Sequence, residues 1–534
     1  MKKTILTLSL AGLAAGVFAQ QNKTAMKYAP IISAELANKH LSILASDEFE
    51  GRETGKPGAD KAAHYIADEF KALGLQPIVN GSYFFDVAVV QNLFKINSFA
   101  VNGTALTSGK DFNAFAGTGT KVINAKDIVF VGYGIGADNY DDLKGIDLTG
   151  KVVMYISTGE PTRDGISKIS GTANPSDWTG LRSRKRQAYI LSKNPGLILA
   201  VTIANGAAPT GARSGGFGGA QRELPMTLKK DGPAAPITIT LPQATADMLL
   251  KGTGKTIADL KAAIDASGTP ASQTVATDIA VDYATQEIPV KAVDVLGFLP
   301  GSDPKLKDEV LVISGHYDHI GLVRDPNAKD KVNNGADDDG SGTTGVLTIA
   351  KAFAQAKKDG KGPRRSILFL GNVGEEKGLL GSEYYTDHPV IPLERTIADL
   401  NIDMIGRVGE EYIGKLDSAN YVYVIGSSML STDLHKAGDN ANNTYTKLKL
   451  DYKYDDPADP NRFYYRSDHY NFAKHNVPII FYFNGVHADY HRPGDEVSKI
   501  NFPLLAKRAQ LVFYTAWDLA NADKRPVVDG KNTR

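Results

Sequence analysis

Short apolar runs typical of buried strands alternate with helical segments in the second half of the chain, and this alternation constrains the fold most. A helical segment rich in alanine and other apolar residues, at 343–356, separates the first two runs. Strands separated by helices favour a mainly parallel sheet that is covered by helices on both faces. The sequence therefore predicts an α/β fold with a mixed, mainly parallel sheet. The runs lie at 309–314, 365–371, 398–404, 421–426 and 478–483.

Acidic residues and histidines, flanked by glycine, directly follow most of these runs. The carboxyl ends of parallel strands meet at one edge of a sheet, so we expect these side chains to lie close together. Carboxylate oxygens and imidazole nitrogens are zinc ligands, and the set suffices for two ions with one carboxylate left to act as a base. The segments are His316-Tyr-Asp318, Asp337-Asp338-Asp339, Glu375-Glu376, Asp403, and Asp489-Tyr490-His491.

The spacing within these segments suggests different chemical roles. His316 and Asp318 are two residues apart, so on an extended chain they point the same way, and a carboxylate beside a metal-bound imidazole fixes its orientation. The side chains of Glu375 and Glu376 diverge, so one can bind a metal while the other takes a proton from water. Asp403 ends an apolar run, where a lone charge is costly unless it is paired or bound to metal.

Each segment taken alone also has an ordinary structural interpretation. The His316-to-Asp318 pair fits a surface salt bridge, and Glu375-Glu376 fits an acidic helix start. The Asp337-to-Asp339 turn fits a solvated turn or a calcium loop, but no glutamate closes an EF-hand loop that starts at Asp337. The five segments together favour a metal site.

The composition excludes several classes of partner and ligand. The chain has 534 residues with 60 basic and 60 acidic side chains, so no long-range field favours nucleic acid or an anionic membrane. The chain has no cysteine, which excludes disulfides and thiolate-bound zinc. Any zinc must therefore be held by histidines and carboxylates.

The first residues have the pattern of a signal for export. Lys2 and Lys3 precede an apolar run at 5–19, and small residues at its end suggest cleavage after Ala19. A membrane anchor is the alternative, but the run is too short to span about 30 Å of hydrocarbon. We therefore expect a signal peptide at residues 1–19 and an exported protein, periplasmic or secreted, with no membrane span after signal removal.

The character of the sequence changes near residue 125. From there to about 250, strands and glycine-rich turns predominate, with no histidine and no compact acidic group. We interpret residues 126–269 as an inserted, mostly β domain and residues 28–125 with 270–525 as a discontinuous catalytic domain. One continuous fold is the alternative.

The residues from about 285 to 520 resemble the zinc aminopeptidase and glutamate carboxypeptidase-like family of co-catalytic metallopeptidases. The resemblance extends to Gly51-Arg52-Glu-Thr-Gly55 with its flanking helices at 33–75, and residues 125–265 resemble the protease-associated domain that many members carry. For that domain the resemblance implies a role in substrate gating or binding.

The family resemblance also implies a role for each site residue. One zinc ion would be bound by His316 and Asp403 and the other by Glu376 and His491, with Asp338 bridging both. Glu375 would be the general base, Asp318 would orient His316, and Tyr490 would help to stabilise the oxyanion. The peptide bond before Asp339 is often cis in members. The implied ligands and catalytic groups are His316, Asp318, Asp338, Glu375, Glu376, Asp403, Tyr490 and His491.

The expected activity is hydrolysis of the N-terminal peptide bond of peptides with a free N-terminus, using two Zn²⁺ ions per chain. A glutamate carboxypeptidase-like exopeptidase would need a basic pocket for the substrate's carboxylate. A glutaminyl cyclase, which is a transferase, would work with one zinc. A non-catalytic binding protein on this scaffold would be expected to have lost ligands, and all are present here. Candidates for a basic pocket are Arg407, Arg462, Arg466 and Arg492.

Overall fold

The computed structural model describes residues 21–114, 119–179, 184–203, 224–229 and 236–530. The expected signal peptide, residues 1–19, lies outside the described residues. The chain divides into two compact units: unit 1 consists of residues 1–89 and 290–534, and unit 2 of residues 90–289.

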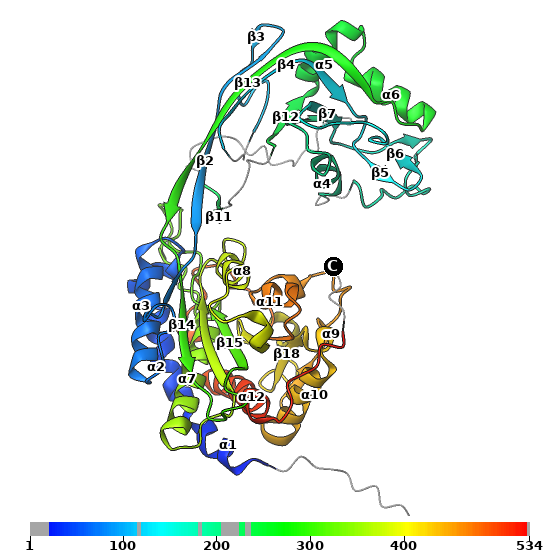
Figure 1. The fold of residues 1–534 in the computed structure, drawn as a ribbon. Coiled ribbons are helices and arrows are strands. Elements are labelled where there is room, and N and C mark those ends of the chain that lie inside the picture. The colour runs from blue at the N-terminus through cyan, green and yellow to red at the C-terminus, as the bar shows by residue number, and fades with distance from the viewer. Residues whose placement is uncertain (1–20, 115–118, 180–183, 204–223, 230–235, 531–534) are drawn as a thin grey trace, which may run out of the picture. The chain divides into compact units, whose positions relative to one another are not determined.

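A mixed sheet forms the centre of unit 1 (Figure 1). The neighbouring strands β16, β15, β17 and β20 run parallel, whereas β14 and β18 pair antiparallel with β16 and β20. Every residue of β15, β16 and β17 is buried, which requires cover on both faces. The predicted α/β fold is confirmed. In order across the sheet the strands are β1 (Phe84–Asp86), β14 (Val293–Leu299), β16 (Ser366–Asn372), β15 (Val310–His316), β17 (Thr396–Ile402), β20 (Ile479–Phe483), β18 (Tyr421–Ile425) and β19 (Lys449–Asp451).

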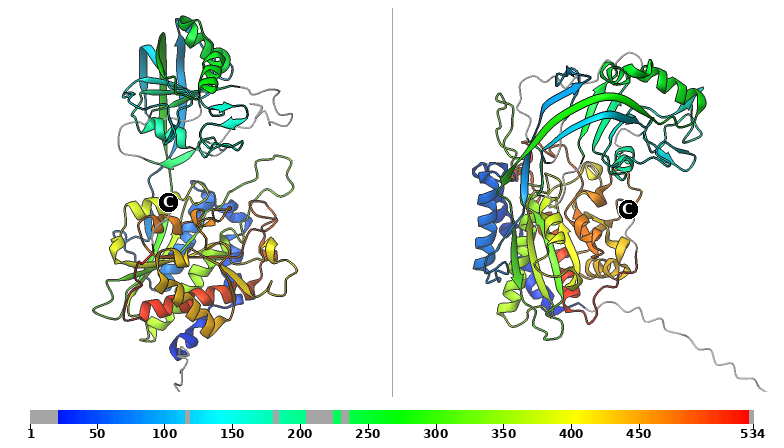
Figure 2. Two further views of the ribbon diagram at one scale, coloured as in Figure 1. Left: turned by 90° about the vertical axis from the view of Figure 1, so that its right-hand side faces the viewer. Right: turned by 45° about the horizontal axis from the view of Figure 1, so that its top comes forward.

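Two long helices, α7 and α12, pack against the central strands, and α11 contacts β17 and β20 (Figure 2). Helix α7 begins directly after the acidic turn, because the side chain of Asp339 accepts a hydrogen bond from the backbone N–H of Gly342 and caps the helix. The helices of unit 1 are α1 (Lys23–Tyr28), α2 (Ala34–Leu44), α3 (Pro57–Ala72), α7 (Gly340–Lys358), α8 (Leu380–Asp387), α9 (Ser427–Leu430), α10 (Thr432–Ala441), α11 (His469–Lys474) and α12 (Phe502–Asn521).

Unit 2 is built on a second sheet with its own apolar core, and β7, β10 and β12 in it run parallel. The sheet has the order β11 (Met226–Leu228), β2 (Val89–Val101), β13 (Gln273–Val290), β4 (Lys121–Phe130), β7 (Val152–Ile156), β10 (Leu197–Thr202) and β12 (Thr238–Pro242), with β3 (Thr104–Ala105) on β2. Beside it are the pairs β5 (Gly136–Ala137) with β6 (Tyr140–Asp141) and β8 (Thr162–Arg163) with β9 (Ile166–Ser167), and helices α4 (Lys185–Leu191), α5 (Gln243–Leu250) and α6 (Ile257–Ser267).

The units divide at other residues than the predicted 125/126 and 269/270. Residues 90–125 lie in unit 2 and not in the catalytic unit, because β2 and β4 both pair with the long strand β13. The change of composition near residue 125 therefore falls inside the β4 strand and does not mark a boundary. The resemblance of this region to a protease-associated domain stays a prediction.

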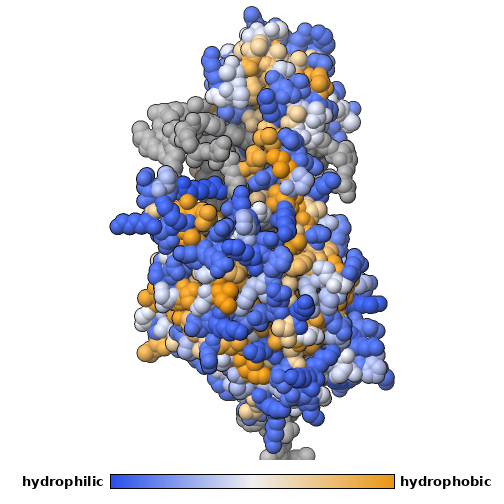
Figure 3. All heavy atoms as spheres, turned by 90° about the vertical axis from the view of Figure 1, so that its left-hand side faces the viewer, coloured by the Kyte–Doolittle hydropathy of each residue, from blue (hydrophilic) through white to orange (hydrophobic). Residues whose placement is uncertain are grey.

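The surface of unit 1 is predominantly hydrophilic on the face that Figure 3 shows, with hydrophobic residues in small separate patches. Among the described residues, no helix has the length and apolar character needed to cross a membrane.

A buried arginine fastens the C-terminal helix to the loop that follows β17. Arg508 on α12 is fully buried, and its Nε donates to the carbonyl of Tyr421 at 2.8 Å. Its Nη1 donates to the carbonyls of Ile405 and Arg407, both at 2.8 Å. Three backbone carbonyls near the site therefore depend on one guanidinium.

We expect Arg508→Met to lower the free energy of unfolding of unit 1 by at least about 3 kcal/mol, since each carbonyl left unpaired costs about 1–3 kcal/mol. Urea unfolding followed by Trp517 fluorescence, in a Trp178→Phe background, measures this. The control is Arg525→Met, whose side chain is partly exposed and bonds two carbonyls near the surface. Equal losses in the two variants would contradict the role given to Arg508.

Candidate active site

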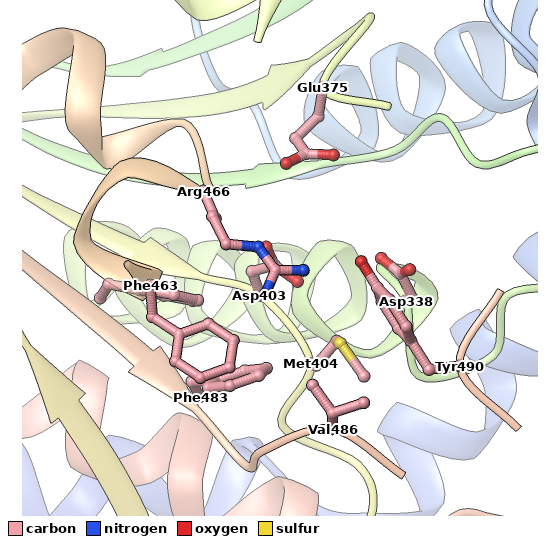
Figure 4. Close-up of a pocket in the computed structure, with 10 residues that line it drawn as sticks. Asp338, Glu375, Asp403, Met404, Phe463, Arg466, Phe483, Val486 and Tyr490 are labelled. Atoms are coloured by element: carbon pink, nitrogen blue, oxygen red, sulfur yellow. The ribbon is translucent and has the colours of Figure 1, made fainter. Parts of the chain in front are cut away.

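The residues predicted to bind metal converge at one edge of the unit 1 sheet. Each follows a strand or precedes a helix, as the sequence indicates: His316 ends β15, Asp338 precedes α7, Glu376 follows β16, Asp403 follows β17 and His491 follows β20. Figure 4 shows Asp338, Glu375, Asp403 and Tyr490 around a single pocket.

Asp338 lies between two groups of potential ligands. Its Oδ1 is 3.4 Å from Nε2 of His316, and its Oδ2 is 3.1 Å from Nε2 of His491. Nε2 of His316 is also 3.7 Å from Asp403, and Nε2 of His491 is 3.1 Å from Glu376. The two oxygens of one carboxylate thus face two different clusters, which is the arrangement a bridging ligand needs.

The unpaired atoms of the site fit metal ions. Within the described part of the chain, Nε2 of His316, Oδ2 of Asp338 and Oε1 of Glu376 are buried without a hydrogen bond. Buried polar atoms are normally paired, and neighbouring carboxylates repel one another unless a cation lies between them. Histidine nitrogens and carboxylate oxygens are the ligands that zinc accepts in the absence of cysteine.

The turn that carries Asp338 has a cis peptide bond between Asp338 and Asp339. The Oδ1 of Asp339 accepts hydrogen bonds from the backbone N–H groups of Gly342 and Met404, at 2.8 and 2.9 Å. Asp339 also lies within a possible metal-binding group with His316 and Asp403. Its Oδ1 is thus taken up by the helix cap, whereas its Oδ2 is buried without a hydrogen bond. Among the described residues, Asp338 and not Asp339 has a carboxylate oxygen within 4.0 Å of a His316 nitrogen, so Asp338 is the residue between the clusters.

The ionisable groups of the site strongly shift one another's pKa values. Burial lowers the pKa of His491, but Asp338 and Glu376 outweigh burial and raise that pKa to about 10. Burial, together with the charges of Glu376 and Asp403, raises the pKa of Glu375 well above its usual range. A metal ion that binds His491 would therefore release a proton from it.

Asp318 acts in a different way from the prediction. The Nδ1 of His316 lies 3.0 Å from the backbone carbonyl oxygen of Asp318, whereas the carboxylate of Asp318 is 3.8 Å away. The carboxylate instead accepts from the Thr54 hydroxyl at 2.7 Å and from the backbone N–H of Glu375 at 3.2 Å. The backbone of Asp318 thus orients His316, and its side chain positions the loop of Glu375.

The loop at 51–55 supports the site through the hydrogen bonds of Arg52. Arg52 is fully buried and donates to the carbonyls of Tyr317, Asn334 and Gly335 at 2.7 to 2.8 Å, and to that of Leu44 at 2.7 Å. The end of β15 and the acidic turn are joined in this way. The motif of the loop at 51–55 was recognisable in the sequence, but the long-range contacts of Arg52 could not be predicted from it.

The acidic turn is held from its other side by the segment around His491. The Oδ2 of Asp495 accepts from the backbone N–H groups of Asp337 and Asp338 at 2.9 and 3.1 Å. Asn484 donates to the carboxylate of Asp337 at 3.0 Å, and Arg407 lies 3.5 Å from Asp495. Arg407 is therefore a structural cation and is not available to bind a substrate carboxylate.

Sequence reasoning missed one histidine of the site. His319 is fully buried, and its Nδ1 lies 2.9 Å from Glu376 and 3.7 Å from Asp338. On an extended chain an odd spacing from His316 would put the two rings on opposite faces. The strand ends at His316, however, and the chain then turns the ring of His319 back toward the site.

A pocket with an apolar wall adjoins the acidic groups (Figure 4). Tyr490 lines it with its ring stacked on His491, and burial raises the pKa of its hydroxyl, which stays protonated and able to donate. Arg466 reaches into the same pocket and lies over the ring of Phe463 at 4.9 Å. The apolar lining consists of Met404, Phe463, Phe481, Phe483 and Val486.

The chain matches a known peptidase family over this region. Residues 294–516 match the family model described as Peptidase family M28. The resemblance expected from the sequence is confirmed over these residues. The M28 region contains every predicted ligand and catalytic residue together with His319, whereas Arg52 and Thr54 lie outside it.

Curated relatives of the chain are similar over part of its length. Aminopeptidase YwaD of Bacillus subtilis is 26% identical over 230 residues, which cover 41% of this chain and 43% of that protein. The probable leucine aminopeptidase 2 of Aspergillus oryzae is 28% identical over 268 residues, 45% of this chain and 48% of that protein. The chain spans about half the length of the curated relatives it matches.

Two solved structures align with more than nine tenths of the chain. The aminopeptidase from Aneurinibacillus sp. strain AM-1 has a TM-score of 0.47 at 18% identity and covers 95% of this chain and 98% of that one. BSAP, a zinc aminopeptidase from Bacillus subtilis, has a TM-score of 0.44 at 16% identity, covering 93% and 98%.

We expect Thr54→Val to weaken zinc binding about 10- to 100-fold, the loss typical of removing a group that supports a metal site. Valine has nearly the shape of threonine but leaves a buried carboxylate oxygen of Asp318 without its donor. Competition with a chromophoric chelator measures the affinity. Thr54→Ser keeps the hydroxyl and should bind zinc like the wild type; equal weakening in both variants would contradict this role.

Proposed function

We propose that the protein is a zinc-dependent aminopeptidase that removes the N-terminal residue of peptides. The observation that carries the proposal is the position of Asp338 between two clusters, with Glu375 beside them and lining the pocket. The match of the M28 region and the relatives named as aminopeptidases support it.

Two zinc ions fit the ligands present. His316, Asp403 and Asp338 would hold one ion, and Asp338, Glu376 and His491 the other. Such ions supply Lewis acidity, which lowers the pKa of water and polarises a peptide carbonyl.

The position of Glu375 supports a role as the general base. Its carboxylate lines the pocket and lies 3.9 Å from Nε2 of His316, while its backbone is fixed by Asp318. In this position the carboxylate can take a proton from the attacking water and pass it to the leaving amine. The Tyr490 hydroxyl belongs to a residue that lines the same pocket, which supports donation to the oxyanion.

The pocket favours a substrate with an apolar first residue. The apolar lining named above can accept such a side chain, while the surrounding carboxylates attract a free α-ammonium group. An amine that must reach these carboxylates limits cleavage to the N-terminal bond. This arrangement supports an exopeptidase.

A carboxypeptidase is the second candidate, and Arg466 is the observation that favours it. This guanidinium lines the pocket, and among the described residues it makes no ion pair of its own. Such a cation suits a substrate carboxylate. The acidic groups outnumber this one cation around the pocket, and we therefore place the aminopeptidase first.

We expect Glu375→Gln to keep its zinc and to lose at least about 10²-fold in kcat, because removal of a general base costs about that much. Peptide hydrolysis assayed together with the zinc content of the same sample measures both effects. A variant with wild-type kcat would contradict the assignment of the base.

The direction of cleavage can be read by mass spectrometry of a peptide mixture in free and N-acetylated pairs. We expect stepwise loss from the N-terminus of the free peptides alone, starting with apolar residues. A chelator should abolish the loss and zinc should restore it. Loss of residues from the C-terminus would instead establish the carboxypeptidase. One zinc per chain together with cyclisation of N-terminal glutamine would establish the cyclase.

A further inference from the structure

His319 is held firmly at the site by its backbone and by its ring. Its N–H donates to the carbonyl of Arg52 at 3.1 Å, which ties it to the loop at 51–55. A side chain at Gly335 would come within 2.5 Å of the imidazole, so the ring packs directly against that backbone. Its ring also meets that of His491 edge-on, with centroids 5.6 Å apart. The position is therefore fixed before any ligand binds.

The Nδ1 of His319 makes no well-directed hydrogen bond to Glu376, although the two atoms are close. Nδ1 lies 2.9 Å from Oε1 of Glu376, yet within the described residues both atoms are buried without a hydrogen bond. The distance suits such a bond, so it is the direction of the N–H that does not. The nitrogen and the oxygen are close enough to be two ligands of one ion.

A third atom lies close to these two. Oδ2 of Asp338 lies 3.7 Å from Nδ1 of His319 and is also without a hydrogen bond. His319, Asp338 and Glu376 form a group whose ligand atoms all lie within 4.8 Å of one another. His491 approaches the same two carboxylates at 3.1 Å. Two imidazoles and two carboxylates thus surround one position.

We propose that Nδ1 of His319 is a direct ligand of the ion at Asp338, Glu376 and His491. This inference rests on the proposed two-metal function. It makes the two sites unequal: that ion has four protein side chains, whereas the ion at His316, Asp403 and Asp338 has three. In zinc proteins four protein ligands close a site, while three leave a position for water or substrate.

The inequality has two consequences. The four-ligand site holds its ion more tightly, so zinc fills the protein in two separate steps, with this site first. The ion at His316 keeps the open position, and Glu375 lies on that side, 3.9 Å from His316. An ion at the His316 site would thus be the one able to polarise the substrate carbonyl, while an ion at the His319 site would mainly anchor Asp338 and Glu376.

Zinc titration of the stripped protein against a chromophoric chelator tests the proposal without an activity assay. Wild type should show two binding steps of different affinity. His319→Ala should weaken the tighter step by about 10³-fold or more, beyond the 10- to 100-fold that loss of an outer partner causes. The control is His388→Ala, since His388 is exposed at the end of α8 and should leave both steps unchanged.

The proposal is overturned if His319→Ala leaves the zinc affinity of the tighter step unchanged or weakens it no more than 100-fold. A crystal structure of the zinc-loaded wild type gives a second test that does not depend on how the variant folds. Nδ1 of His319 at about 2.0–2.1 Å from zinc supports direct ligation, and a separation beyond 3 Å overturns it.

The failure of this inference can be told from failure of the proposed function. Two zinc ions in wild type with no effect of His319→Ala would remove only the role of His319. No zinc in wild type would remove both. Two unequal steps that depend on His319, without peptide cleavage, would keep His319 as a ligand and remove the aminopeptidase.

Discussion

The structure of the site depends on the carboxylate of Asp338, whose two oxygens face His316 on one side and His491 on the other. A bridging carboxylate works only if its backbone is fixed. That backbone is held by Asp495 from the segment of His491, and the same turn is joined to the end of β15 by Arg52. Segments from both ends of unit 1 therefore meet at the acidic turn that carries Asp338.

The second constraint is charge, since the site brings several carboxylates together in a buried place. Isolated buried carboxylates are costly, and the protein offsets them with nearby cations. The pKa of His491 is raised to about 10, and the buried guanidinium of Arg52 adds a fixed positive charge. Zinc ions can replace the proton on His491, so metal binding and proton release are coupled.

The strands, the α/β fold and the convergence of the predicted ligands followed from local patterns, because a parallel sheet brings the ends of its strands together. His319 did not follow, since the strand ends at His316 and the alternation of side chains ends with it. Thr54 supports Asp318 from 264 residues away, and such a contact leaves no local trace. The unit boundary was missed for the same reason, because the partner of β2 and β4 is a distant strand.

The central claim is that Asp338 is shared by two zinc ions, and the zinc content of Asp338→Ala tests it most directly. Zinc would be counted by elemental mass spectrometry on wild type, on this variant and on Asp164→Ala, an exposed aspartate of unit 2. The account predicts two ions per chain in wild type and in Asp164→Ala, and none or one in Asp338→Ala. Two tightly bound ions in Asp338→Ala would contradict it.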